Sequence, residues 1–135
     1  MAFSQEPLEG KGVLYSARGV VDGAEMLSGA LADARAAAER GELEYALVDF
    51  TLVTELRVTP VDVRRAIEKD ERLARIAPHV ILALVAPTDH VFGMARMYQT
   101  LAEDTGWTIQ VFRRRRDAED WIADLRTARR LPETP

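Results

Sequence analysis

The pattern of hydrophobic and polar positions predicts alternating strands and helices. Residues 45–51 contain the unbroken apolar run Ala46, Leu47 and Val48, and polarity returns at Asp49. A strand that is apolar on both faces is typical of a parallel sheet covered by helices on both sides. We therefore expect this strand to organise an α/β sheet.

Three further stretches predict strands. Residues 13–21 are rich in β-branched and aromatic side chains, residues 80–86 form the most apolar run, and residues 107–112 alternate. We expect residues 80–86 in the middle of the sheet because none of their side chains is polar. Residues 1–12 are polar and predict a loose arm or an edge strand. The pattern leaves open whether the first strand pairs in parallel or antiparallel.

A first helix is predicted between the strands at 13–21 and 45–51. Asp22 followed by Glu25 resembles a capping box, and Gly41 suits a left-handed helix end. The apolar residues of this segment share one helical face; they are Leu27, Ala30, Leu31, Ala34 and Ala38.

Thr59 is placed to cap a second helix, which has Pro60 at its first position and ends before Pro78. One face of this helix carries the expected buried stripe, made of Val63, Ala66, Ile67 and Ala74. Residues 68–72 carry mixed charges and predict a solvated face.

Two more helices complete the pattern. The third is expected over about residues 90–104, and Gly93 inside it predicts a close contact with a strand, since glycine costs about 1 kcal/mol relative to alanine there. The fourth begins at Asp117, and its packing stripe contains Ala118, Trp121, Ile122 and Leu125.

Four successive strand–helix units predict one α/β domain over residues 13–128, followed by a frayed tail at 129–135. We expect a mostly parallel, mixed sheet of about four or five strands with helices on its faces.

Composition narrows the function classes. The chain has 135 residues, no cysteine, a net charge of −4 and a pI near 5.2. These values exclude disulfides and thiolate nucleophiles and argue against a nucleic-acid-binding domain. The longest apolar run is far shorter than the roughly 20 residues that cross a bilayer. Residues 1–10 lack the pattern of a secretory signal, so we expect a cytoplasmic protein without integral membrane association.

The arginine run at residues 113–116 is the most conspicuous local charge. We interpret it as a solvated loop neutralised by Asp117, Glu119 and Asp120, with partner docking as the second interpretation.

The segment Asp49, Phe50 and Thr51, followed by a short loop and a helix, resembles the STAS fold of anti-sigma-factor antagonists. Residues 91–113, followed by an acid-capped helix with Trp121, are similar to a branch of SpoIIAA-like proteins of unassigned function. The resemblance spans residues 13–125. It implies a regulatory module that binds other proteins.

Known antagonists of this type are switched by phosphorylation of a serine where the second helix starts. Here Thr59 and Pro60 occupy that place, and the serine is absent. Thr59 is thus a candidate phosphoacceptor, although a helix cap is the favoured interpretation.

Candidates for catalysis are few. His79 and His90 are the two histidines, and neither is spaced to pair with another ligand or a nucleophile. Phosphate-binding and metalloprotease motifs are absent from the sequence. We therefore expect no enzyme activity, no metal and no cofactor.

Ligands of open α/β sheets bind beyond the carboxyl ends of the strands. Two helices begin at that edge and point free N–H groups toward it. The residues expected to form an anion-binding edge are Arg57, Thr59, Thr88, His90 and Arg113. They support the alternative function, a carrier of a small anionic or lipid-like ligand.

The third helix carries more large apolar residues than one buried stripe needs. If Met94, Met97 and Tyr98 are exposed, they form a surface for a protein partner or for a homodimer. The function we predict is a non-catalytic protein-interaction module.

Overall fold

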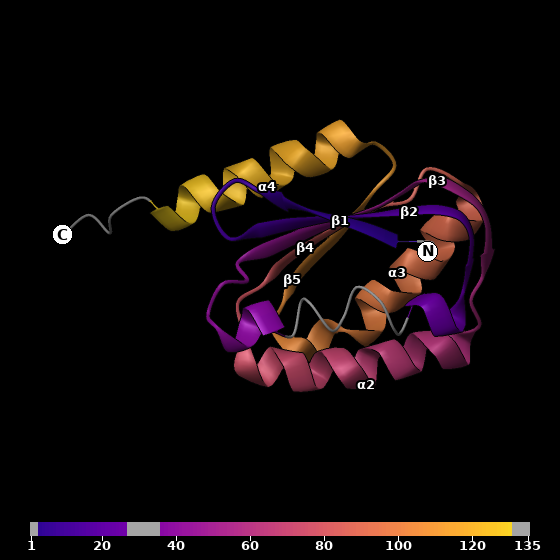
Figure 1. The fold of residues 1–135 in the computed structure, drawn as a ribbon, viewed down its shortest axis with the longest axis horizontal. Helices are drawn as coiled ribbons and strands as arrows, with labels where there is room; N and C mark the ends of the chain where they lie inside the picture. Colours follow the sequence, from indigo (N-terminus) through magenta and orange to yellow (C-terminus); the bar gives the residue numbers. More distant parts are fainter. Residues whose placement is uncertain (1–2, 27–35, 131–135) are drawn as a thin grey trace.

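The computed structural model describes residues 3–26 and 36–130, which form one sheet with helices on both faces (Figure 1). The strands are β1 (Phe3–Leu8), β2 (Gly12–Asp22), β3 (Tyr45–Arg57), β4 (Ile81–Val85) and β5 (Thr108–Phe112). The helices are α2 (Pro60–Ile76), α3 (Asp89–Leu101), the 3-10 turn η1 (Glu103–Thr105) and α4 (Arg115–Arg130).

The strands lie in the order β1-β2-β3-β4-β5. β1 pairs with β2 antiparallel, and the other three pairs are parallel. The prediction of a mostly parallel mixed sheet is confirmed. The expectation that residues 80–86 lie in the middle is wrong: β3 is central, and β4 is one strand from the edge. Helices cover both faces, so β4 is completely buried there too.

The predicted first helix lies partly outside the described residues, so its apolar stripe from Leu27 to Ala34 is not described. Its start is described: the backbone N–H of Glu25 donates to Oδ1 of Asp22 over 2.8 Å. Gly41 has a φ of 68°, as expected of a helix end. The chain then enters β3 at Tyr45.

β3 is longer than the pattern indicated. It continues to Arg57 and stays paired with β2 up to Asp22, whereas β4 ends at Val85, opposite Asp49. In the extension, Val53 and Leu56 are partly buried and the other four residues are exposed, and the pairing with β2 shifts register between Gly19 and Val20. We call residues 18–22 and 52–57 the β2–β3 ribbon, because they form two strands that extend past the rest of the sheet.

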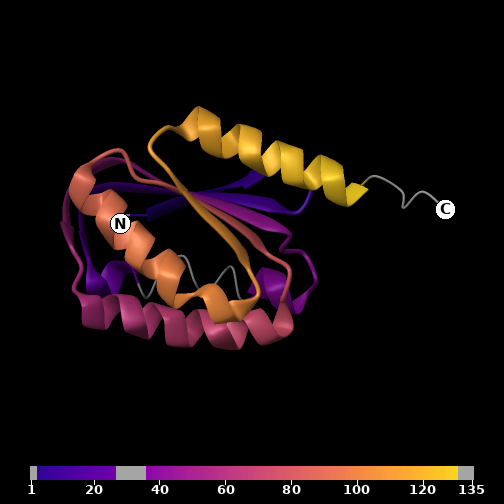
Figure 2. The same ribbon diagram turned by 180° about the vertical axis from the view of Figure 1, so that it is seen from behind.

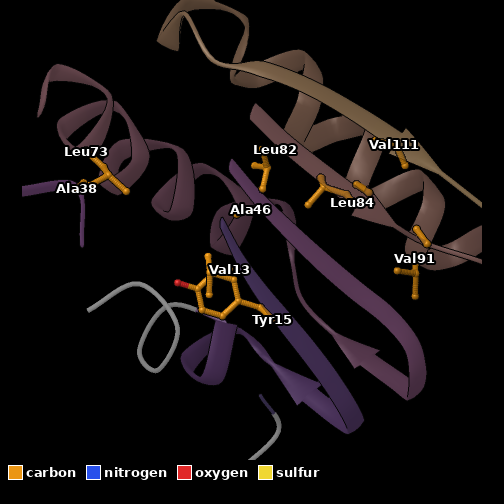
Figure 3. Packing of buried hydrophobic residues seen from close by; sticks show 11 residues of the cluster. Val13, Tyr15, Ala38, Ala46, Leu73, Leu82, Leu84, Val91 and Val111 are labelled. Carbon is orange, nitrogen blue, oxygen red and sulfur yellow. The ribbon is translucent and has the colours of Figure 1, made fainter. Parts of the chain in front are cut away.

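Alternating side chains of the sheet form two separate cores. Ile81, Ala83 and Val85 of β4 face α4, where they pack with Ala118 and Ile122. The even-numbered residues of β4 face α2 and α3, on the side opposite α4 (Figure 2). The second core is drawn in Figure 3; it includes Val13, Tyr15, Ala46, Leu73, Leu82, Leu84, Val91 and Val111.

Three local expectations are corrected by the structure. α4 begins at Arg115 rather than Asp117, so part of the arginine run is helical. Gly93 is exposed and a Cβ there would meet open space, so the expected close contact with a strand is absent. Asp70 is not on a solvated face. It is 5% exposed, because its position continues the buried spacing from Val63 and Ile67.

Candidate functional site

The carboxyl edge of the sheet carries the residues that the sequence suggested for an anion site. α2 begins there after Thr59, α3 begins after Thr88, and β5 ends just before Arg113. The structure therefore places these residues on neighbouring elements. Their hydrogen bonds determine what the edge can do.

Arg57 lies at the end of the ribbon and pairs with Glu55. Its Nε and Nη2 donate to the two carboxylate oxygens over 3.0 and 3.1 Å. This hydrogen bonding lowers the pKa of Glu55 and raises the pKa of Arg57. Both side chains are exposed, so the pair contributes little to stability. The guanidinium is nevertheless occupied by a carboxylate of its own strand.

Arg113 is held at the start of α3. Its Nη1 donates to Oδ1 of Asp89 over 2.8 Å and to the carbonyl oxygen of Pro87 over 3.3 Å. The guanidinium also lies over the ring of Phe92, 4.1 Å from the ring centroid. Asp89 thus supplies a negative charge where the helix N-terminus favours one.

His90 connects α3 to the ribbon. Its Nε2 lies 3.2 Å from the carbonyl oxygen of Leu56. The contact bridges 34 positions in the sequence and ties the ribbon to the first turn of α3. His90 and Arg113 therefore bind parts of the chain itself at this edge.

Thr59 forms a complete capping box with Asp62. Its hydroxyl accepts from the backbone N–H of Asp62 over 3.2 Å, and its own N–H donates to Oδ2 of Asp62 over 2.9 Å. The bond from that N–H is the main reason why the pKa of Asp62 is lowered. Thr88 occupies the same position before α3 without a side-chain cap bond. The geometry of Thr59 fits the cap interpretation, and its phosphorylation stays a prediction.

In the segment Asp49–Phe50–Thr51, the Asp49 carboxylate forms hydrogen bonds within the fold. Oδ1 of Asp49 accepts from the backbone N–H of Thr51 over 2.8 Å and from the Thr51 hydroxyl. Its Oδ2 lies 3.4 Å from Nη1 of Arg115, in the first turn of α4. Asp49 is 8% exposed, so these contacts satisfy a buried carboxylate.

Unlike the exposed Arg115, one arginine further along α4 is buried. Arg126 is 7% exposed; its Nε lies 3.4 Å from Oε1 of Glu44, and its guanidinium lies 4.6 Å from the ring centroid of Tyr45. The structure packs this side chain near the end of α4 against the start of β3. Spacing could have shown this, because Arg126 lies one turn after Ile122.

The three α3 residues expected at a partner surface have different surroundings. Met94 and Tyr98 are partly buried and line a cavity between α3, α2 and the sheet. Met97 is also partly buried, but it is not among the residues of the cavity wall.

This cavity has a volume of about 160 Å³, is partly open, and is lined almost entirely by apolar side chains among the described residues. Neither Arg57 nor Arg113 is among its described wall residues. The wall does include Asp70 of α2, which accepts a hydrogen bond from the hydroxyl of Tyr98 of α3. Burial raises the pKa of Asp70 to about 6, and it also raises the pKa of Tyr98.

The sequence analysis missed this buried pair. The signal available was helical spacing, because Asp70 lies seven residues after Val63 and three before Leu73 on the same face of α2. A run of five charged residues hid the signal, since four of its neighbours are exposed.

Within residues 3–26 and 36–130, no group of His, Asp and Glu side chains is arranged to hold a metal ion. In the same part of the chain, no helix is long and apolar enough to cross a membrane.

No family model matches the chain, and no curated protein matches its sequence. Two solved structures match its fold. The anti-sigma factor antagonist SpoIIAA, in its unphosphorylated form, is 16% identical with a TM-score of 0.56, covering 90% of this chain and 98% of that one. An uncharacterized protein of the DUF3478 family from Shewanella loihica PV-4, described as having a SpoIIAA-like fold, is 14% identical with a TM-score of 0.50; the match covers 89% and 91%.

At these identities the matches establish the fold. They agree with the topology described above, a five-stranded mixed sheet with helices on both faces. The resemblance suggested by the sequence is confirmed at this level. The chain therefore has a SpoIIAA-like fold.

Proposed function

We propose that this domain is a non-catalytic interaction module that docks to another protein or to a second copy of itself in the cytoplasm. The observation that carries the proposal is the β2–β3 ribbon. It extends beyond β4 and exposes Leu52 and Val20, which are 54% and 42% accessible. Likeness in fold to an anti-sigma factor antagonist supports a regulatory role of this kind.

The ribbon has the composition of a small docking surface. Leu52 is paired with Arg18, and Val20 with Glu55, so apolar side chains lie among charged ones. Interfaces commonly combine an apolar centre with a polar rim. The ribbon is also anchored, because His90 contacts Leu56 and the inward residue Val21 is fully buried. An anchored surface loses little conformational freedom on binding.

Met97 of α3 is a second proposed contact. It is partly exposed and lies outside the described cavity wall. Met94 and Tyr98, which face the cavity, are less suited to a flat partner surface.

The alternative, an anion carrier at the carboxyl edge, is less well supported. An anion would have to displace Glu55 from Arg57 and Asp89 from Arg113, and both displaced carboxylates would then repel it. The docking module requires no such rearrangement.

Native mass spectrometry of the gently isolated chain tests the proposal. The variant Leu52→Lys is compared with Ile76→Lys, a matched change at an exposed residue that is 43% accessible at the end of α2. Both variants change the net charge equally. We expect the wild type and Ile76→Lys to carry a bound polypeptide or form a dimer, and Leu52→Lys to lose it. Equal complexes for both variants would contradict the role of the ribbon, and a bare monomer for the wild type would contradict the module.

A further inference from the structure

The cavity between the sheet and helices α2 and α3 shares one described wall residue, Leu56, with the ribbon and none of the ribbon's exposed side chains. Residues from strands and helices that are far apart in the sequence form its wall. Several of these residues are labelled in Figure 3. Among the apolar wall residues are Val63, Leu73, Leu82, Leu84, Val91 and Met94. An enclosed apolar cavity of about 150 Å³ binds benzene or xenon in another protein, whereas the one described here has a similar volume but also opens toward solvent. The volume of about 160 Å³ therefore admits a compact molecule about the size of one aromatic ring.

Asp70 is the one charged residue in the described part of this wall. A carboxyl group is costly to bury, and an apolar residue at this position would pack without that cost. Tyr98 donates a hydrogen bond to Oδ2 of Asp70. Among the described residues, no donor bonds to the other carboxyl oxygen, Oδ1. The Asp70 carboxyl can therefore accept a further hydrogen bond.

We propose that this cavity binds a compact apolar molecule that carries one hydrogen-bond donor, and that the donor bonds to the carboxyl of Asp70. The apolar wall, aliphatic and aromatic, holds the body of the ligand, and Tyr98 fixes the orientation of the carboxyl. Binding sites of small molecules commonly combine an apolar lining with a few polar groups that set orientation.

This arrangement predicts an order of affinity among ligands of similar size. Benzyl alcohol has the ring and a donor, toluene has the ring without a donor, and benzoate replaces the donor with a negative charge. A hydrogen bond to a charged group contributes about 1.5–3 kcal/mol, so benzyl alcohol is expected to bind at least about tenfold more tightly than toluene. Benzoate is expected to bind weakest, because its carboxylate would be buried beside that of Asp70.

Two variants separate the polar contact from the cavity itself. Asp70→Asn keeps the size of the side chain and replaces a charged acceptor with a neutral one. The preference for benzyl alcohol over toluene should then fall about fivefold, while the affinity for toluene stays the same. Ala95→Leu places additional methyl groups in the cavity wall and should weaken binding of both ligands.

The test is a titration of the full chain with benzyl alcohol, toluene and benzoate at about pH 8, where the Asp70 carboxyl is ionised, followed by methyl NMR. We expect saturable shifts at methyl groups of Leu84, Val91 and Met94, in the stated order of affinity. Leu52→Lys, on the ribbon, should bind the three compounds as the wild type does. The proposal is overturned if these methyl groups do not shift, if benzoate binds as well as benzyl alcohol, or if folded Asp70→Asn retains the wild-type preference.

Discussion

The two faces of the sheet are both apolar, but they are filled to different degrees. On the α4 face, Ile81, Ala83 and Val85 are completely inaccessible, and Ala118 of α4 is too. On the opposite face, Leu82 and Leu84 are 8% and 6% exposed and border the cavity. The same short strand therefore supplies a tightly packed core on one side and the wall of a cavity on the other.

The difference follows from how each face is covered. A single amphipathic helix, α4, lies along β3, β4 and β5, and its alanine allows a close approach to the strands. The other face is covered by α2 and α3, which contact each other through the Asp70–Tyr98 pair. We conclude that the α4 face mainly stabilises the fold, whereas the α2–α3 face combines stability with space for a ligand.

The largest expected effect is on the α4 face. Ile81→Ala should lower the free energy of unfolding by about 4 kcal/mol, because it leaves a new void in a filled core. Leu84→Ala, on the same strand, should cost nearer about 2 kcal/mol, because its side chain already borders open space. Urea denaturation of both variants measures the comparison. Equal losses would mean that the two faces are packed alike.

The free energy of unfolding should depend on pH through Asp70, which lies in the cavity wall. The pKa of Asp70 is raised from 3.8 to about 6, so the folded state binds the proton more tightly than the unfolded chain. The contribution of this group is therefore fully present below about pH 4 and is lost as the pH rises through about 6. The loss amounts to at most about 3 kcal/mol.

The variant Asp70→Asn isolates this dependence, because other acids titrate in both proteins. The stability of the wild type minus that of Asp70→Asn should fall between about pH 4 and about pH 6.5 and then level off. A difference that stays constant over this range would show that Asp70 is not buried as described.

Substitution of Gly10 tests how closely the β1–β2 turn packs against Arg126 of α4. Its φ is 70°, and a Cβ there would lie 2.6 Å from Nη2 of Arg126. Gly19 has a φ of 71° with open space around it. Gly19→Ala should cost about 1 kcal/mol from backbone strain alone, and Gly10→Ala somewhat more, because the end of the Arg126 side chain must also shift. Thermal unfolding measures both; a cost at Gly10 no larger than at Gly19 would contradict the close packing of Arg126.

The smallest effect is a gain in stability on the cavity face. Gly93 lies within α3, is exposed, and has nothing near the position of a Cβ. Gly93→Ala should stabilise the protein by about 0.5–1 kcal/mol through helix propensity and a less flexible unfolded chain. If the same measurement shows that Gly93→Ala is destabilised, the close helix–strand contact predicted from the sequence would be supported instead.

The strands and their mostly parallel pairing were predictable, because apolar strand patterns alternate with capped helix patterns along the chain. Thr59 was correctly identified as a cap, since Asp62 follows at the spacing of a capping box. The length of β3 was not predictable from its apolar run, because residues 52–57 become a strand through pairing with β2.

The candidate sites were less predictable because they depend on tertiary contacts. Arg57 and Arg113 were expected to face an anion, but nearby carboxylates bind them in the folded chain. Asp70 was hidden by charged neighbours, although its helical position pointed inward. Charge alone did not indicate which side chains pair, and the partner of Asp70 is set by the packing of α3 against α2.

The contrast between the two faces is tested most directly by methyl NMR of the full chain under xenon, which enters apolar cavities without requiring a polar partner. We predict saturable shifts at the methyl groups of Leu82, Leu84 and Met94, with those of Ile81, Val85 and Ile122 unchanged. Shifts on the α4 face, or no shifts on the α2–α3 face, would contradict the division into a filled core and a hollow one.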